Sequence, residues 1–282
     1  MRVISFLLAI LLSGCAAAQS AEPQPSIATA AGDSVSPTET MQTWWQPKPG
    51  TSWQIQFTGE QIDTSYDVAA YDLDLFDTAQ IIVDELHSEG KYVICYLNAG
   101  AWENWRPDAA EFPGEVIGND YEGWPGERWL DVSKIELLAP IIEARLDLCK
   151  EKGFDGVDPD NLDGYANATG FNLNEEDTIA YALWLAEETH ARGLAIGIKN
   201  IPDLASRLEP HFDWALLESC FAQVWCEEMN VFIENGKPVF AIEYVEEGMT
   251  LEDFCAEAKA LSFSAILKNR ELDAWVEFCD SL

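Results

Sequence analysis

Four times along this chain, a stretch with the period of an amphipathic helix runs into a short apolar stretch with the length of a β-strand. The helical stretches span residues 81–89, 135–152, 174–192 and 251–261, and the apolar stretches that follow them span 91–100, 153–161, 193–200 and 263–269. Further strand-like stretches lie at residues 68–75, 128–132, 212–218 and 238–244. About eight strands with helices between most of them predict a parallel sheet that is covered by helices.

The ends of these helices carry their own signals. Gly90, Gly153 and Gly193 follow three of the helical stretches, at the position where a helix often ends on a left-handed residue that glycine adopts without strain. Asn174 and Thr250 are expected to cap the helices that they precede, and Thr250 with Asp253 predicts a capping box. The helix boundaries are therefore better defined than the strand boundaries.

Polar residues at the strand ends distinguish a closed barrel from an open sheet. An open dinucleotide-binding sheet needs a Gly-x-Gly-x-x-Gly turn after its first strand, and this sequence has none. A ring of polar side chains at the carboxyl ends of strands is typical of the active face of a barrel, so we predict an α/β fold of the (β/α)8 TIM-barrel type. The residues in this ring are Asp72, Asp74, Asn98, Asp131, Asp158, Asp160, Lys199, Asn200, Glu218, Glu243, Tyr244, Lys268 and Asn269.

Charge restricts the partners of the protein. The 282 residues include 50 Asp and Glu against 16 Lys and Arg, which gives a formal net charge of −34. A nucleic acid would be repelled by such a surface, so nucleic-acid partners are excluded. The same charge would attract a polycationic substrate, although adaptation to salt or simple solubility explains it equally well.

The first residues predict an export signal and a lipid anchor. The apolar run at residues 3–12 is too short to span a membrane, and the following Leu-Ser-Gly-Cys resembles a bacterial lipobox. Residues 1–14 are then a signal peptide, Cys15 is lipidated and contacts the membrane, residues 15–43 form a flexible tether, and residues 44–282 form one globular domain with the barrel fold. The residues after Cys15 predict an exported lipoprotein at the outer membrane or cell surface, and an ordinary secretory signal is the alternative.

The remaining six cysteines predict disulfides, because their number is even and the protein is expected to be exported. Cys220 and Cys226 are close enough to close one loop, and Cys255 with Cys279 would hold the C-terminal segment. The sequence alone does not select among the possible pairings. The three histidines lack the spacing of zinc ligands, so no metal site is predicted.

Six stretches of the chain resemble glycoside hydrolase family 114, the endo-α-1,4-polygalactosaminidase family. They lie at residues 71–78, 93–108, 123–132, 153–165, 197–200 and 216–221, and the most specific are WPGERWLD and DPDNLDGY. The resemblance runs from about residue 44 to 244 and implies a (β/α)8 barrel, no organic cofactor, and hydrolysis of α-1,4-linked galactosamine polysaccharide by two carboxylates. The family's acidic positions match the segment that begins at Asp158, and Glu218.

Glycoside hydrolysis itself requires two facing acidic side chains. We expect Asp158 to be the nucleophile because it ends its strand, with Asp160, beyond Pro159, as the alternative. Glu218 is expected to act as general acid and then as base, with a pKa that nearby carboxylates raise. An endo-acting, retaining reaction is favoured, and retention rests on analogy with barrels that carry carboxylates on strands four and six.

Ten further residues are predicted to contact the substrate: Asp72, Asp74, Tyr96, Asn98, Trp102, Trp105, Lys199, Asn200, Glu243 and Tyr244. Trp102, Trp105 and Trp124 lie in loop-like segments, where stacking on a sugar competes with ordinary core packing. Arg106 and Arg128 either fix loops through ion pairs or contact substrate, and the first role is favoured for Arg128.

Two alternatives to a two-carboxylate glycosidase remain. Asp158, Asp160 and Asp163 resemble the start of a calcium loop and would allow a metal-dependent hydrolase, but Thr169 stands where a calcium-binding Glu is needed. The other alternative is a surface lipoprotein that binds glycan without cleaving it.

Overall fold

Residues 44–279 are described by the computed structural model, so the predicted signal peptide, Cys15 and the tether lie outside the described residues. None of the helices in this range has both the length and the apolar character that a membrane-spanning helix needs.

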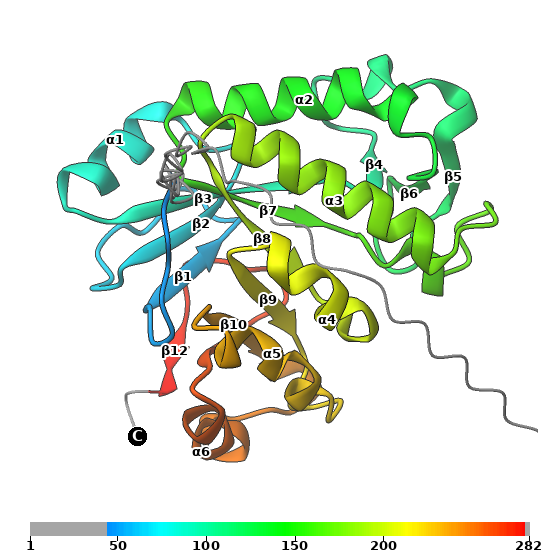
Figure 1. Ribbon diagram of the computed structural model, residues 1–282. Helices are drawn as coiled ribbons and strands as arrows, with labels where there is room; N and C mark the ends of the chain where they lie inside the picture. The colour runs from blue at the N-terminus through cyan, green and yellow to red at the C-terminus, as the bar shows by residue number, and fades with distance from the viewer. Residues whose placement is uncertain (1–43, 280–282) are drawn as a thin grey trace, which may run out of the picture. The chain divides into compact units, whose positions relative to one another are not determined.

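A curled parallel sheet forms the centre of the catalytic domain (Figure 1), and the predicted (β/α)8-type barrel is confirmed. Its parallel strands follow one another in sequence order: β1 (Trp53–Gln56), β2 (Ala70–Asp74), β3 (Tyr92–Asn98), β7 (Gly156–Asp160), β8 (Ala195–Lys199), β9 (Trp214–Glu218), β10 (Val239–Tyr244) and β11 (Ser264–Lys268). A last strand, β12 (Glu277–Phe278), pairs antiparallel with β11. The carboxyl ends of the parallel strands therefore meet at one face of the barrel.

Helices connect the strands and bury their apolar faces against the outside of the sheet. They are α1 (Gln80–Ser88), α2 (Ile135–Lys152), α3 (Glu175–Ala191), α4 (Ala205–Leu208), α5 (Asn230–Glu234) and α6 (Leu251–Leu261). Short 3-10 helices lie at Ala109–Glu111, Gly114–Val116, Gly164–Ala166, Pro202–Leu204, Glu209–His211, Cys226–Met229 and Val245–Glu247.

The predicted helix signals are confirmed. Gly90, Gly153 and Gly193 have φ angles of 79°, 91° and 68°, the left-handed conformation that ends a helix. Asn174 accepts a hydrogen bond from a backbone amide of α3, and Thr250 forms the expected capping box with Asp253 in the first turn of α6. These local signals set the residues at which the helices begin and end.

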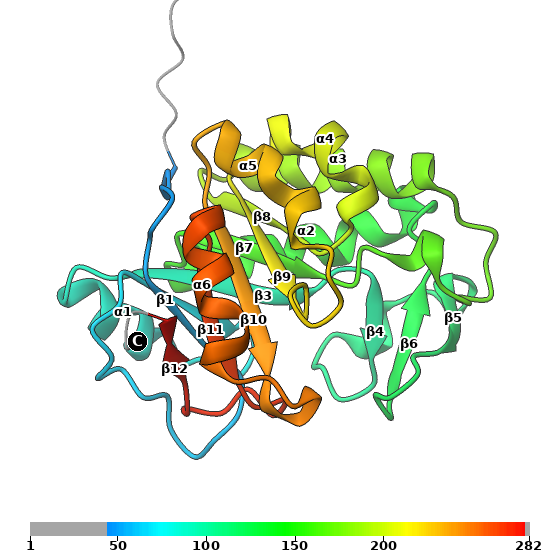
Figure 2. The ribbon, with the colours of Figure 1, turned by 90° about the horizontal axis from the view of Figure 1, so that it is seen from below.

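One predicted barrel strand lies elsewhere. Residues 128–132 contribute to β6 (Glu127–Leu130), which joins β4 (Ala101–Glu103) and β5 (Ile117–Asp120) in a separate antiparallel sheet. Figure 2 shows this sheet beside the barrel, and it leaves the barrel at the carboxyl end of β3. Asp131 is therefore not part of the ring of strand ends, and its carboxylate accepts a hydrogen bond from the hydroxyl of Ser133.

The first strand of the barrel is β1, which the sequence analysis did not predict. It has only four residues, and the buried side chains of Gln54 and Gln56 interrupt the apolar pattern. Because one strand is gained and one is lost, Asp158 still lies on the fourth strand of the barrel and Glu218 on the sixth.

The two ends of the sheet meet at a seam between β1 and β11. The indole nitrogen of Trp53 donates to the carbonyl of Ser264 over 2.8 Å. The amides of Phe57 and Thr58 both donate to the carbonyl of Leu272, over 2.8 and 3.2 Å. The segment between β11 and β12 thus closes the barrel against the end of β1.

Three disulfides join the six cysteines of the domain. Cys220–Cys226 and Cys255–Cys279 form as expected, and the remaining pair is Cys95–Cys149. The last pair connects β3 to α2, so it fixes a covering helix to the central sheet.

Candidate active site

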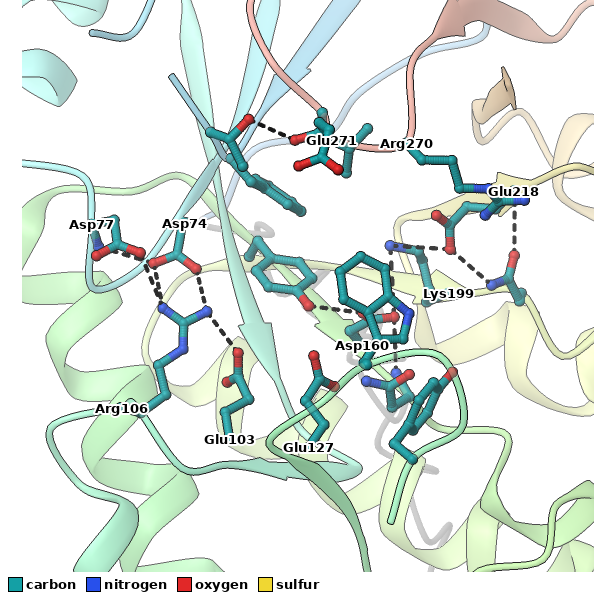
Figure 3. A pocket seen from close by; sticks show the side chains of 18 of the residues that line it. Asp74, Asp77, Glu103, Arg106, Glu127, Asp160, Lys199, Glu218, Arg270 and Glu271 are labelled. Carbon is teal, nitrogen blue, oxygen red and sulfur yellow. Dashed lines mark hydrogen bonds and ion pairs between the residues drawn. The ribbon is translucent and has the colours of Figure 1, made fainter. Parts of the chain in front are cut away.

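A cavity of about 430 Å³ opens at the carboxyl ends of the strands. Strands β2, β3, β7, β8, β9 and β10 each contribute a side chain to it, and these are Asp74, Tyr96, Asp160, Lys199, Glu218 and Tyr244 (Figure 3). All six belong to the predicted catalytic and substrate-binding residues, and Trp105 and Asn200 also line the cavity. The barrel therefore brings residues that are far apart in the sequence to one site.

The ammonium group of Lys199 lies at the centre of this site. Its Nζ atom is 3.3 Å from Asp158 Oδ2 and 3.7 Å from both Asp160 Oδ1 and Glu218 Oε2. Burial opposes the charge of Lys199, but the attraction of the three carboxylates outweighs burial and raises its pKa well above the usual value. Lys199 is a permanent cation among carboxylates.

Asp160 and Glu218 face each other across Lys199. Because one oxygen of each carboxylate lies 3.7 Å from the same nitrogen, the two oxygens are separated by at most twice that distance. This limit allows both the separation of about 5–5.5 Å in retaining glycosidases and the shorter end of the inverting range, about 6.5–9.5 Å.

Four polar groups hold Glu218. The hydroxyl of Tyr244 donates to Oε1 over 2.5 Å, and the side-chain amide of Asn200 donates to Oε2 over 3.3 Å. Burial raises the pKa of Glu218, but Lys199, the bonds from Tyr244 and Asn200, and Arg270 together hold it below its usual value. The prediction that neighbouring carboxylates raise the pKa of Glu218 was wrong, because it did not include these donors.

Asp160 is the last residue of β7, not a loop residue as the sequence analysis expected. Its Oδ2 atom accepts a hydrogen bond of 2.8 Å from Tyr96, and its Oδ1 atom accepts one of 2.9 Å from the amide of Asn161. Its carboxylate lines the cavity. Asp160 is thus fixed in place and still accessible to a substrate.

Asp158 lies deeper in the barrel and has no exposed surface. Side chains on one face of a strand recur at every second residue, so Asp158 and Asp160 both point into the barrel at successive depths. Burial raises the pKa of Asp158 to about 6, in spite of the opposing attraction of Lys199. Asp158 does not line the cavity, whereas Asp160 does.

Four predicted substrate contacts lie outside the cavity lining. Asp72 is buried within the barrel, and Asn98 accepts a hydrogen bond from the amide of Ala101. Trp102 donates to the carbonyl of Ala109, and Glu243 accepts bonds from the amides of Phe221 and Ala222. Asn98, Trp102 and Glu243 thus bind backbone groups of loops and strands. Burial raises the pKa of Glu243 to about 7.

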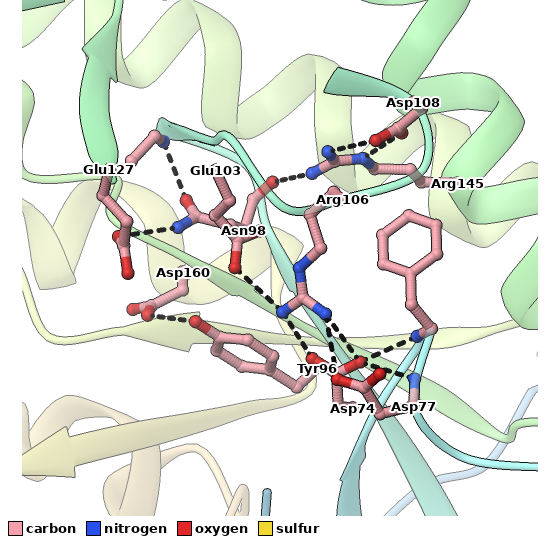
Figure 4. Close-up of polar contacts among 12 residues, drawn as sticks. Asp74, Asp77, Tyr96, Asn98, Glu103, Arg106, Asp108, Glu127, Arg145 and Asp160 are labelled. Atoms are coloured by element: carbon pink, nitrogen blue, oxygen red, sulfur yellow. Dashed lines mark hydrogen bonds and ion pairs between the residues drawn. The ribbon is translucent and has the colours of Figure 1, made fainter. Parts of the chain in front are cut away.

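The wall of the cavity beside β2 is built around Arg106 (Figure 4). Its guanidinium pairs with Asp74 at 2.6 Å, Glu103 at 2.8 Å and Asp77 at 3.3 Å. Arg106 therefore fixes a loop through ion pairs, which was one of its two predicted roles. Arg128 pairs with Asp120 at 3.5 Å on the surface, consistent with the loop-fixing role favoured for it.

The sheet formed by β4, β5 and β6 supplies two acidic residues that the sequence analysis missed, Glu103 and Glu127, which line the cavity. Trp105 and Trp124, which the sequence analysis placed in loops, also line it and are about half exposed. Burial first, and then the charges of Glu103 and Asp160, raise the pKa of Glu127 to about 8. The sequence held a signal for Glu103 and Glu127, because each lies close to a loop tryptophan in the motifs WENWRPD and WPGERWLD.

Lys199 also bears on the alternative of a metal cluster. The metal-dependent alternative places a metal ion between Asp158 and Asp160. In the structure, the ammonium group of Lys199 lies beside both of these carboxylates. Asp163 accepts a hydrogen bond of 2.8 Å from Asn167. Between residues 44 and 279, no group of three His, Cys, Asp or Glu side chains has an arrangement that suits a metal ion.

Comparison with known proteins decides the family. The sequence model of glycoside hydrolase family GH114 matches residues 34–282. The chain belongs to glycoside hydrolase family 114. It is therefore a glycosidase, and its partner is a glycan.

Several proteins resemble this family 114 member over most of its length. The crystal structure of Aspergillus fumigatus Ega3 in complex with galactosamine is 40% identical, has a TM-score of 0.80, and covers 83% of this chain and 97% of its own. The glycoside hydrolase domain of PelA from Pseudomonas aeruginosa shares the fold, with 14% identity, a TM-score of 0.65, and coverage of 81% and 98%. An uncharacterized Deinococcus radiodurans protein is 26% identical over 307 residues, or 94% of this chain and 95% of that protein.

Proposed function

We propose that this glycosidase cleaves α-1,4-linked galactosamine-containing polysaccharide within the chain and with retention of configuration. The observation that carries the proposal is the pair of cavity carboxylates, Asp160 and Glu218, on either side of Lys199. The 40% identity to Ega3, whose crystal structure contains galactosamine, supports the choice of sugar.

In the first step, Asp160 attacks the anomeric carbon while the glycosidic oxygen leaves with a proton from Glu218. In the second step, Glu218 takes a proton from water, and the water oxygen displaces Asp160 from the sugar. Tyr96 and Lys199 orient the attacking carboxylate. Each carboxylate ends the cycle in its starting state.

Glu218 must gain a proton before it can act as the acid. Lys199 lowers its pKa in the free site. A leaving oxygen that enters between Glu218 and the ammonium weakens this attraction and removes water, and both changes raise the pKa of Glu218. Substrate binding thus favours the protonated acid.

The lining of the cavity supports a cationic sugar. Glu103, Glu127 and Asp163 line the same cavity as Asp160 and Glu218. The ammonium group of a bound sugar would be attracted by these acidic side chains. The exposed faces of Trp105 and Trp124 are suited to stacking on sugar rings.

The test is incubation with deacetylated and acetylated α-1,4-galactosamine oligomers, with mass spectrometry of the products and NMR of the newly formed anomer. We expect internal cleavage of deacetylated oligomers and an α-configured product. Asp160→Asn and Glu218→Gln should each lower kcat by about 10³-fold or more, while the surface variant Glu257→Gln should match the wild type. Intact oligomers with the wild type, including binding without cleavage, would refute the proposal.

Azide rescue assigns the two roles. Azide should restore Asp160→Gly with a glycosyl azide of inverted configuration, because azide then replaces the nucleophile. With Glu218→Ala it should give the retained azide, because azide then attacks the glycosyl-enzyme. The opposite pattern would exchange the roles, and an inverted azide from Asp158→Gly alone would make Asp158 the nucleophile.

A further inference from the structure

Two buried carboxyl groups lie deeper in the barrel than the cavity and have no role in the proposed reaction. Asp72 on β2 and Asp158 on β7 both have no exposed surface. Both oxygens of Asp72 and Oδ1 of Asp158 lack a hydrogen-bond donor among the described residues. Buried carboxylate oxygens without donors are costly, so this arrangement needs a physical explanation.

Charge counting gives the explanation. The charged groups that act on this pair are Lys199 from β8, Asp160 from β7 and Glu218 from β9. Arg270 adds positive charge beside Glu218 at the cavity, but these two cations cannot balance four carboxylates if all four are ionised. A proton on one of the two deep carboxyls removes one negative charge and supplies the missing donor.

The proton belongs on Asp72. Burial, and then the charge of the neighbouring Asp158, raise the pKa of Asp72 well above its usual value. Lys199 lies directly beside Asp158, at 3.3 Å, and favours the ionised form there. Asp158 therefore carries the charge, and Asp72 remains neutral.

We propose that Asp72 is a positioning residue whose neutral carboxyl donates a hydrogen bond to Asp158, and that the pair, with one negative charge between them, fixes Lys199 between Asp160 and Glu218. The roles of Asp160 and Glu218 rest on the proposed function. No bond is made or broken in the pair, because the proton only bridges two oxygens. The pair sets the position of the cation to which both reacting carboxylates respond.

Two substitutions of Asp72 distinguish a role as hydrogen-bond donor to Asp158 from a role in packing alone. Asp72→Asn keeps a donor toward Asp158, so kcat should stay within about fivefold of the wild type. Asp72→Leu removes the donor, so kcat should fall by about 100-fold with KM changed less than about threefold, because Asp72 does not touch the cavity. Asp84→Asn on the exposed face of α1 is the matched control. Equal losses in the Asn and Leu variants would overturn the proposal.

A double-mutant cycle tests the shared charge. In Asp158→Asn, the carboxyl of Asp72 is free to ionise and take the place of the missing charge, so part of the activity should remain. The double variant Asp72→Asn with Asp158→Asn has no charge, and its kcat should lie at least about tenfold below the product of the single effects. Additive effects would contradict a pair that shares one charge.

Infrared difference spectroscopy tests the proton without any substrate. At neutral pH Glu127 and Glu243 also contribute C=O stretches of protonated carboxyls, so the readout is the difference between variants: Asp72→Asn should lose one such stretch from the wild-type spectrum, and Asp84→Asn should lose none. If Asp72→Asn loses no stretch, Asp72 does not hold the proton and the proposal fails. If the wild type leaves galactosamine oligomers intact, the proposed function fails, but the difference between variants still decides the state of the pair.

Discussion

At the scale of single residues, the proposed reaction makes its pH range depend on the ionisation of Glu218. The pKa of Glu218 in the free site lies below its usual 4.5, and a general acid must be protonated when it acts. The protonated fraction therefore rises as the pH falls. We expect kcat/KM for deacetylated oligomers to increase from about pH 7 to about pH 5, as measured by a pH profile of initial rates.

A substitution of Tyr244 gives a second test of this prediction. Tyr244→Phe removes the shortest hydrogen bond that favours ionised Glu218, so the falling limb of the profile should move to higher pH. The surface variant Glu257→Gln should leave the limb in place. Maximal kcat/KM above pH 8 in the wild type would show that Glu218 is not the proton donor.

Glu127 links stability to pH. Its pKa rises from 4.5 to about 8 on folding, so the folded state binds this proton more tightly than the unfolded state. Between these two values the contribution of Glu127 to stability falls as the pH rises. The melting temperature of Glu127→Gln should match the wild type near pH 5 and exceed it near pH 8, in thermal scans at each pH. A pH-independent difference would contradict the raised pKa.

The sequence predicted most of the strand-end side chains that line the cavity, but not how deep each lies in the barrel. Asp160, Lys199, Glu218 and Tyr244 were predicted and line the cavity. Asp158 was placed at the tip of its strand because Pro159 was taken to end it, whereas β7 continues to Asp160. A shift of two residues along a strand preserves the direction of the side chain and changes only its depth, which periodicity does not reveal.

At the scale of secondary structure elements, three strands fit together inside the barrel around Trp214. A Cβ atom at Gly197 would lie 2.0 Å from the indole nitrogen of Trp214, and one at Gly156 would lie 2.6 Å from the same ring. These two positions are glycines because the large side chain of Trp214 on β9 occupies the space that their side chains would need. The distance between β7, β8 and β9 therefore depends on having glycine at these two positions.

Gly197→Ala should therefore destabilise the barrel by about 3 kcal/mol or more, because close packing leaves no space for the methyl group. The measurement is the free energy of unfolding in urea. Gly114→Ala is the matched control, since nothing lies within 4 Å of its new Cβ atom. Adding Trp214→Phe to Gly197→Ala should restore part of the loss, and unchanged stability of Gly197→Ala would contradict this account.

Elements with local signals were predicted well, and elements that depend on distant partners were not. The helices carried caps and left-handed glycines, so their positions followed from the sequence. Residues 128–132 have an ordinary strand pattern, but their partners are β4 and β5. No local property of a strand states which sheet it joins, since pairing depends on contacts with remote segments.

At the scale of the whole molecule, we propose that Cys15 attaches the catalytic domain to a membrane. A lipidated wild type should stay in the membrane fraction until detergent is added, and Cys15→Ser should leave that fraction. Fractionation with radiolabelled fatty acid measures both effects. Ser20→Ala is the control, and equal membrane association without label in the wild type and Cys15→Ser would reject the anchor.

The rim of the cavity is completed by the two ends of the catalytic domain. Thr58 follows the first barrel strand and Leu272 follows β11, and they meet at the seam and line the cavity together. A nascent polypeptide therefore carries Asp160 and Glu218 before the rim is complete, because the segment around Leu272 is synthesised after both of them. Proteolytic removal of the chain from Asn269 onward would open the seam, and we expect the enzyme to lose its activity while Asp160 and Glu218 remain in the chain.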